Sequence, residues 1–218
     1  MEEPSSVDHL SSSLTDLMTS LMVIFILLLL VFVHRTAGKD AAVTDVLLKR
    51  LLQDMAPQGF SDKTIRRDPR DRNAILVIVP DRLMNFETGK STLRPEGEQF
   101  LRTYIPEFAG VLCSDQFRSS VESIVVEGHT DKQSLAGTAE DSENRNLKLS
   151  QDRSMEVVKN ALADLSGMES KRGCFLEKLS ASGRGEQEQE ATPEESRRVI
   201  LRIRVKVVDA ESTKVALR

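Results

Sequence analysis

Hydrophobic residues are concentrated in one block near the start of the chain. Residues 21–33 read LMVIFILLLLVFV, thirteen positions without a charged or hydrogen-bonding side chain. As a helix these residues would span about 20 Å, less than the roughly 30 Å of a bilayer's hydrocarbon core. Extending the segment back to Leu14 gives about 30 Å. The pattern therefore predicts a membrane-spanning helix over residues 14–33, preceded by a short tail over residues 1–13.

The block does not have the pattern of a secretory signal peptide. Residues 1–20 contain no Lys or Arg, whereas a signal peptide begins with a basic region. The polar and charged sequence after Val33 is also a poor cleavage site, so we expect an uncleaved anchor. Arg35 and Lys39 follow the block, and the positive-inside rule taken alone favours a cytoplasmic C-terminus.

One carboxylate lies near the N-terminal end of the expected span. Asp16, Thr19 and Ser20 have i, i+3 and i+4 spacing, which places them in one polar stripe on a helix. Asp16 is about 11 Å from the centre of the segment by helical rise. Two interpretations are open: the carboxylate lies in the headgroup region, or it faces other helices around an ion path.

A second periodic segment follows the membrane block. Its apolar positions repeat at helical spacing and predict an amphipathic helix over residues 40–55, ended by Pro57 and Gly59. The apolar positions are Val43, Val46, Leu47, Leu51 and Met55. This helix either packs on its own domain, or pairs with a second copy or plugs an ion path. Residues 57–73 are polar and charged, so residues 34–73 are interpreted as a linker that contains the helix.

Residues 74–208 alternate between strand and helix patterns. Strands are predicted at 75–79, 123–127, 176–182 and 198–208, the last with Arg202, Arg204 and Lys206 on one face. Helices are predicted to run from Pro95 to about residue 109 and over 149–165, with Ser150 as the N-cap of the second. The order β-α-β-α-β-β predicts an α/β sandwich, a mixed sheet with helices on one face. Residues 209–218 form a tail.

Composition excludes several classes of function. With 30 Lys and Arg against 34 Asp and Glu, the net charge of −4 is not that of a nucleic-acid binder. No nucleophile–base pair or phosphate loop is recognisable, so we expect no enzyme, no catalytic residue and no cofactor. His129 is the sole histidine of the predicted domain, and no Cys, His and Asp cluster has metal-ligand spacing, so we expect no metal site.

The chain has two cysteines, Cys113 and Cys174, too far apart for a CxxC motif. Each precedes a predicted strand, so the two side chains could meet across the domain. A disulfide is expected if the domain lies in an oxidising compartment, and two buried thiols are the alternative.

Residues 15–22, TDLMTSLM, resemble the transmembrane signature of the MotB family of stator proteins. In that family the Asp carries the transported proton, so the resemblance implies that Asp16 carries H⁺ or Na⁺, with Thr19 and Ser20 lining its path. The aromatic residue before the Asp and the basic N-terminal tail of the flagellar pattern are missing. The family also has a cytoplasmic N-terminus and a periplasmic domain, opposite to the count of Arg35 and Lys39.

Four motifs resemble the OmpA-like peptidoglycan-binding domain shared by outer-membrane anchors and MotB-type stators. They are 85–91 (NFETGKS), 126–131 (VEGHTD), Asn146-x-x-Leu149-Ser150-x-x-Arg153, and Ser182 with Gly185-Glu186 followed by 197–199 (RRV). In that family an Asp takes the ammonium and an Arg takes the carboxylate of diaminopimelate. By motif position these are Asp131 and Arg153, with Asn146 fixing the neighbouring loop. An ordinary salt bridge between Asp131 and Arg153 is the alternative.

The resemblances imply a MotB-like stator subunit of the bacterial inner membrane that binds peptidoglycan and does not bind nucleic acid directly. Two copies would lie inside a ring of five chains of a MotA-like multi-pass partner. The short spacer, the acidic N-terminus and a long loop over residues 132–145, which could cover the pocket, favour the ZorB family over flagellar subunits. ZorB proteins are MotB-like subunits of Zorya anti-phage systems and work with ZorA. A flagellar-type subunit and a non-conducting tether between membrane and wall are the alternatives.

Overall fold

The computed structural model describes residues 6–84, 86, 87, 89–132 and 138–206; the side chains of residues 6–14, 34–42 and 58 are excluded. The chain divides into two compact units. One comprises residues 1–40 with 208–218, and the other comprises residues 41–207. The tail predicted at 209–218 lies outside the described residues.

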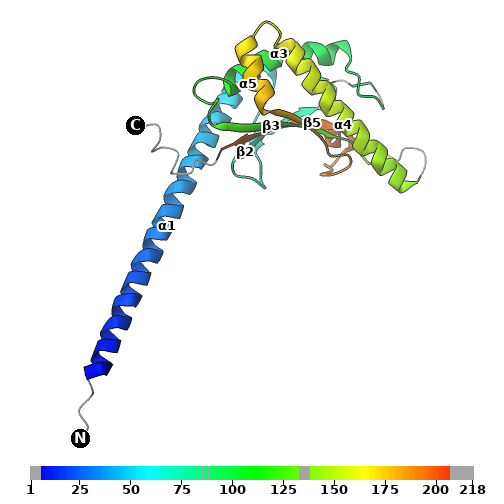
Figure 1. Ribbon diagram of the computed structural model, residues 1–218. Coiled ribbons are helices and arrows are strands. Elements are labelled where there is room, and N and C mark those ends of the chain that lie inside the picture. The colour runs from blue at the N-terminus through cyan, green and yellow to red at the C-terminus, as the bar shows by residue number, and fades with distance from the viewer. Residues whose placement is uncertain (1–5, 85, 88, 133–137, 207–218) are drawn as a thin grey trace. The chain divides into compact units, whose positions relative to one another are not determined.

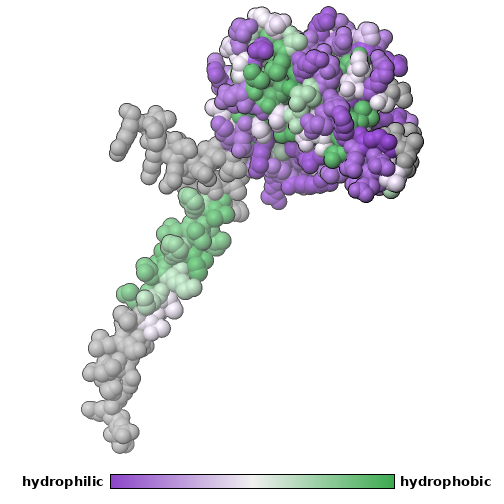
Figure 2. Space-filling model, turned by 45° about the vertical axis from the view of Figure 1, so that its right-hand side comes forward, coloured by the Kyte–Doolittle hydropathy of each residue, from purple (hydrophilic) through white to green (hydrophobic). Residues whose placement is uncertain are grey.

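The first unit contains the N-terminal part of helix α1 (Ser6–Met55). Its stretch Thr15–Val33 has a mean hydropathy of 2.7, and none of it is buried by the rest of the chain (Figure 2). Nineteen helical residues span about 28 Å, close to the thickness of a hydrocarbon core. This exposed apolar helix is consistent with a single membrane span.

The C-terminal part of α1 belongs to the second unit, where it packs into the hydrophobic core. Leu47 and Leu51 are fully buried, Met55 is almost fully buried, and Val43 packs against the same core. Of the two placements open for the amphipathic helix, the structure therefore shows packing on its own domain. Val46 is 47% exposed and does not belong to the buried stripe.

The segment expected to be a linker also contributes to the core. A short 3-10 helix, η1 (Ala56–Gln58), ends at Gly59, which has a left-handed φ of +88°. Strand β1 (Ile65–Arg67) then pairs antiparallel with β2 (Ala74–Pro80). The expectation of a linker over 57–73 is wrong because Phe60 and Ile65 are buried among the core residues.

Among the described residues, five strands form one sheet in the order β1-β2-β5-β3-β4, with β3 (Val121–His129), β4 (Leu179–Gly183) and β5 (Arg198–Val205). β3 and β4 are parallel, and the other neighbours are antiparallel. Alternate residues of the central strands enter the core, including Ile75, Val77, Ile124, Val126, Leu201 and Ile203. Helices α3 (Pro95–Leu112), α4 (Ala139–Asp164) and α5 (Glu169–Lys178) lie on this side of the sheet (Figure 1). The predicted fold class, a mixed sheet with helices on one face, is confirmed. Two short helices, α2 (Asp81–Met84) and α6 (Pro193–Ser196), precede α3 and β5.

Two predicted elements begin three or more residues away from the predicted start. Helix α4 begins at Ala139 and is capped by Thr138, whose side chain accepts from Asp141 N, so Ser150 is a buried interior residue and not the N-cap. The first three turns are almost entirely polar, which hid them from a search for apolar periodicity. Helix α5 takes the first residues of the predicted strand 176–182, and β4 starts only at Leu179.

A disulfide joins the C-terminal end of α3 to the middle of α5. Cys113, the C-cap of α3, is bonded to Cys174 in α5, with the Cα atoms 6.0 Å apart. The bond closes a loop with a sequence separation of 61, for which chain entropy predicts about 4 kcal/mol of stabilisation. Of the two arrangements open from the sequence, the structure therefore has the bonded one.

Helix α4 lies directly against the backbone of β3 and β4. A Cβ atom added at Gly128 would lie 2.1 Å from the Ser150 carbonyl oxygen, and one added at Gly183 would lie 2.7 Å from the Gln151 amide nitrogen. These distances are far below a van der Waals contact, so both strand positions require glycine for the helix to approach.

We expect Gly128→Ala to lower the free energy of unfolding by about 1–3 kcal/mol, because α4 must move away from β3. Gly173→Ala is the matched control, since its added Cβ meets nothing within 4 Å and the position is helical. The control should leave stability unchanged or raise it by up to about 1 kcal/mol. Urea unfolding of the full chain in detergent, followed by circular dichroism, measures both variants. Equal stability of the two variants would contradict the close seating of α4.

Candidate functional site

The strand register gathers charged residues at one end of the sheet. Arg198, the first residue of β5, pairs with Pro80 at the end of β2 and with His129 at the end of β3. The residues just beyond these strand ends therefore meet: Asp81 after β2, Asp131 after β3 and Arg197 before β5. The Asp81 amide also donates to the Arg197 carbonyl oxygen at 3.2 Å.

Arg197 contacts three carboxylates at this end of the sheet. Its Nη1 donates to Asp131 Oδ2 at 2.5 Å, and its Nη2 donates to Glu194 Oε1 at 3.3 Å. Its Nε lies 3.6 Å from Asp81 Oδ2. Burial alone lowers the pKa of Arg197, but Asp131, Asp81 and Glu194 more than compensate, so the net shift is upward.

Arg153 of α4 is held differently. Its Nε donates to the Lys90 carbonyl oxygen at 3.0 Å, and its guanidinium carbon lies 4.9 Å from the centre of the Phe86 ring. Neither Nη nitrogen has a hydrogen-bond or ion-pair partner within the described part of the chain. The residue is only 6% exposed, and burial lowers the pKa of Arg153 while nearby Asp81 and Asp131 oppose that shift.

The backbone around Ser150 positions Arg153. Ser150 Oγ accepts from the Gly185 amide at 2.8 Å and donates to the Leu147 carbonyl at 2.7 Å. Gln151 Oε1 accepts from the Gly183 amide at 2.6 Å. Because Arg153 follows less than one helical turn later, these contacts fix its side chain beside the ends of the strands.

The chain after β4 forms the other side of the site. Asn146 Nδ2 donates to Glu186 Oε1 at 2.6 Å, and the Thr130 amide donates to the Gly185 carbonyl at 2.9 Å. An open pocket of about 340 Å³ lies beside Asp131. It is lined by Asp131, Lys132, Gln189, Glu190, Ala191, Thr192, Pro193 and Ser196. Arg153 is not among the lining residues, so it borders the cluster and not this pocket.

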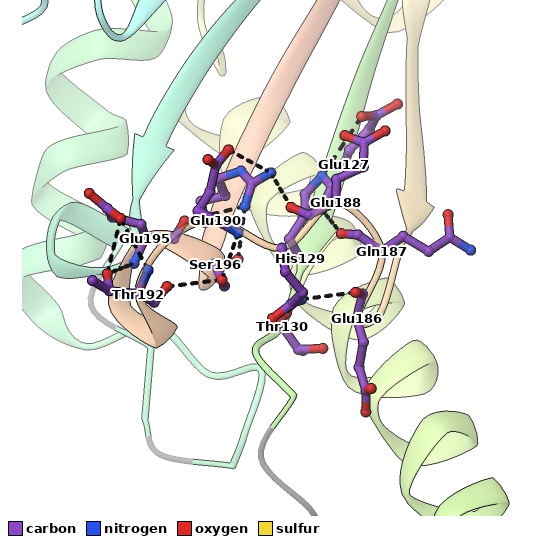
Figure 3. Close-up of polar contacts among 12 residues, drawn as sticks. Glu127, His129, Thr130, Glu186, Gln187, Glu188, Glu190, Thr192, Glu195 and Ser196 are labelled. Carbon is purple, nitrogen blue, oxygen red and sulfur yellow. Dashed lines mark hydrogen bonds and ion pairs between the residues drawn. The ribbon is translucent and has the colours of Figure 1, made fainter.

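An ionic network around the buried Glu127 supports the same region, and Figure 3 shows Glu127 and His129 of β3 beside Gln187. Glu127, 1% exposed, accepts from Arg184 at 2.8 Å and from Arg202 at 3.0 Å. Arg202 also pairs with Asp68. His129 Nδ1 lies 3.2 Å from the Gln187 carbonyl oxygen and donates to it. These contacts tie β3 to the chain that borders the pocket.

The predicted site residues Asp131, Arg153 and Asn146 thus come from β3 and α4 to one end of the sheet. The salt bridge between Asp131 and Arg153 that the sequence left open is not formed, because Asp131 pairs with Arg197. Sequence reasoning missed the roles of Arg197, Asp81 and Glu194. The motif 197–199 was noticed, but its spacing gives no sign that the strand register carries Arg197 to Asp131.

Part of one sequence motif and part of one loop are not described. Asn85 and Thr88 of the motif 85–91, and residues 133–137 of the loop 132–145, lie outside the described residues. From Ala139 onward that expected loop is helical, as the first turns of α4. Within the described ranges, no group of three or more His, Cys, Asp or Glu side chains could hold a metal ion.

Asp16 belongs to the other unit of the chain and forms a separate candidate site. It lies one residue after the start of the apolar stretch Thr15–Val33. The Thr19 hydroxyl lies 2.9 Å from both the Thr15 and the Asp16 carbonyl oxygens. The hydroxyl is thereby satisfied by the helix itself, which allows Thr19 to face an apolar environment without an unpaired donor.

The second unit of the chain resembles known proteins. The model of the OmpA family matches residues 85–200. A search of curated proteins found no match.

Solved structures share the fold. A structure described as MotB-like from Desulfovibrio vulgaris superposes with a TM-score of 0.57 at 19% identity, covering 78% of this chain and 98% of that one. The periplasmic domain of Helicobacter pylori MotB gives a TM-score of 0.50 at 15% identity, covering 70% and 85%.

The network around Glu127 predicts a pH dependence of stability. Burial by itself raises the pKa of Glu127, but His129 and Arg184 more than offset it, so the pKa lies below the ordinary value of 4.5. A depressed folded-state pKa means that the carboxylate stabilises the fold fully above the unfolded-state value. This stabilisation is lost as pH falls through the folded-state value.

We expect Glu127→Gln to lower the free energy of unfolding by about 3 kcal/mol at pH 7, because the partly buried Arg184 and Arg202 lose the buried carboxylate that they share. The deficit should shrink as the pH falls below 4.5. Glu122→Gln, on the exposed part of the same strand, should change stability by less than about 1 kcal/mol. Urea titrations at a series of pH values measure this. A deficit that does not change with pH would contradict the assigned role of the Glu127 charge.

Proposed function

The chain belongs to the OmpA family, and we propose that it is a MotB-like stator subunit whose domain binds the stem peptide of peptidoglycan. Its exposed apolar helix would anchor it in the bacterial inner membrane, with the N-terminus in the cytoplasm and the domain in the periplasm. The two functions depend on separate sites, so each has its own support and its own test.

The unpaired Nη nitrogens of Arg153 beside Asp131 carry the proposal of wall binding. Diaminopimelate ends in an ammonium and a carboxylate on one carbon, so its recognition needs one fixed carboxylate and one guanidinium. Asp131 supplies the first, and Arg153 has two donors that no described residue occupies. Its Nε contact with Lys90 leaves these two donors side by side, in the geometry of a bidentate carboxylate pair.

We expect Asp131→Asn and Arg153→Lys each to weaken binding of a disaccharide tripeptide ending in meso-diaminopimelate by about tenfold or more. Each change removes one charge-assisted contact, or replaces a bidentate contact with a single one. Isothermal titration of the full chain in detergent measures the affinities. Asp152→Asn, an exposed carboxylate of the same helix, is the control and should bind like the wild type. If wild type and Asp131→Asn bind equally, this proposed site is not used.

The polar stripe on the apolar helix supports the proposal of ion transport. Asp16 and Thr19 lie at the N-terminal edge of the stretch Thr15–Val33, in a part of the helix that no other described residue covers. We propose that Asp16, with Thr19 and Ser20 lining its path, carries H⁺ or Na⁺ at the contact with a MotA-like multi-pass ring. Two copies of this chain to five of the partner would form the complex. Protonation removes the charge penalty, and a membrane potential of 100 mV supplies about 2.3 kcal/mol per charge.

For the biological role we propose anti-phage defence of the Zorya type, with the chain acting as the ZorB subunit beside ZorA. The absence of a long spacer supports this assignment over a flagellar subunit, since α1 itself enters the domain core at Leu47. A non-conducting tether between membrane and wall is the second candidate, because an OmpA-family domain and one apolar helix are sufficient for it.

We expect Asp16→Asn to abolish ion flux in proteoliposomes that contain the chain and its multi-pass partner, with unchanged assembly and membrane level. Asp45→Asn is the control, because this exposed carboxylate lies farther along the same helix and should leave flux unchanged. Measuring flux with and without Na⁺ identifies the ion, and phage plating against swimming assays distinguishes defence from motility. If Asp16→Asn retained full phage defence or motility, the non-conducting tether would be favoured.

A further inference from the structure

The two arginines of the site have opposite states of occupation. Each of the three guanidinium nitrogens of Arg197 faces a carboxylate: Nη1 faces Asp131, Nη2 faces Glu194, and Nε faces Asp81. Arg153 faces only the Lys90 carbonyl through Nε. The Arg153 guanidinium can therefore accept an anionic ligand group, whereas the Asp131 carboxylate is already paired with Arg197.

From this asymmetry we propose that Arg197 is a specificity-determining residue that competes with the ligand's ammonium group for Asp131. The inference rests on the proposed function, in which Asp131 receives that ammonium. A ligand binds when its ammonium displaces the Arg197 guanidinium from Asp131 and its carboxylate pairs with Arg153. Arg197 then remains neutralised by Asp81 and Glu194, so the displacement leaves no isolated charge.

The positions of the three carboxylates support an exchange of this kind. Asp131 is 8% exposed, and a carboxylate so buried is unfavourable unless a cation accompanies it. Arg197 supplies that cation and holds the carboxylate in place. The Glu194 side chain is 75% exposed and belongs to the neighbouring helix α6, so it can retain Arg197 at the edge of the cluster.

The exchange has a consequence for specificity. A ligand that lacks a positive charge cannot compensate Asp131 for the loss of Arg197, and should be rejected even if its carboxylate fits Arg153. Removing the competitor should therefore strengthen binding of ligands with an ammonium group and leave other ligands unaffected. A direct contact from Arg197 to the ligand predicts the opposite, a loss of affinity.

The test is isothermal titration of the full chain in detergent with the disaccharide tripeptide ending in meso-diaminopimelate. We expect Arg197→Gln to bind about three- to tenfold more tightly than the wild type, because the Arg197 guanidinium no longer competes with the ligand's ammonium for Asp131. The same muropeptide with its free amine acetylated should show no gain. Weaker or unchanged binding by Arg197→Gln, or an equal gain for the acetylated probe, would overturn the inference.

Glu194→Gln provides a second measurement in the opposite direction. This exposed residue is not needed for packing, and its loss should hold Arg197 more firmly on Asp131, so binding should weaken about twofold. If Arg197→Gln does not fold, as judged by thermal unfolding, unchanged or tighter binding by Glu194→Gln would still overturn the inference.

Asp131→Asn distinguishes a failure of peptide binding from a failure of competition by Arg197. If Asp131→Asn loses affinity while Arg197→Gln gains none, peptide binding stands and competition by Arg197 does not.

Discussion

The contact between helix α4 and the backbone of two strands is the constraint on which the site depends. Gly128 and Gly183 provide no side chain at this interface, so the helix rests against their main chain and Ser150 bonds across it. A helix seated so closely has little freedom to translate or rotate. Arg153, three residues farther along, is therefore positioned at the end of the sheet by packing. Its guanidinium is held there by the Lys90 carbonyl and the Phe86 ring, without an ion pair.

Electrostatics at that end of the sheet follow from antiparallel pairing on both sides of β5. Because Arg198 is paired with β2 and β3 at once, the polar residues that end or begin three strands converge. The convergence produces a cluster of three carboxylates, from Asp81, Asp131 and Glu194, around Arg197. Because Arg197 has three carboxylate partners, it can give up one of them and stay neutralised by the others. The pairing of the buried Glu127 of β3 with Arg184 and Arg202 stabilises the segment after β4, which leads to the pocket.

Helix α1 meets two different environments along its length. None of the stretch Thr15–Val33 is buried by protein, whereas Leu47 and Leu51 are completely enclosed by the domain. The first part gains stability only from an apolar solvent such as lipid, and the second gains it from the core. The domain therefore begins within this helix, and a fragment starting at residue 74 would lack part of its own core.

Sequence patterns alone predicted the apolar span and the fold class correctly, and they also gave the polar stripe at Asp16 and the candidate site residues Asp131, Arg153 and Asn146. These depend on spacing along the chain or on short motifs, which sequence displays directly. The start of α4 and strand β1 were missed because polar helical turns and a three-residue strand carry no clear periodicity. The packing of residues 43–55 on their own domain, and the pairing of Asp131 with Arg197 and not with Arg153, became visible only in the folded structure. Both results depend on contacts between distant residues, whose geometry is set by strand register and helix seating and leaves no local pattern.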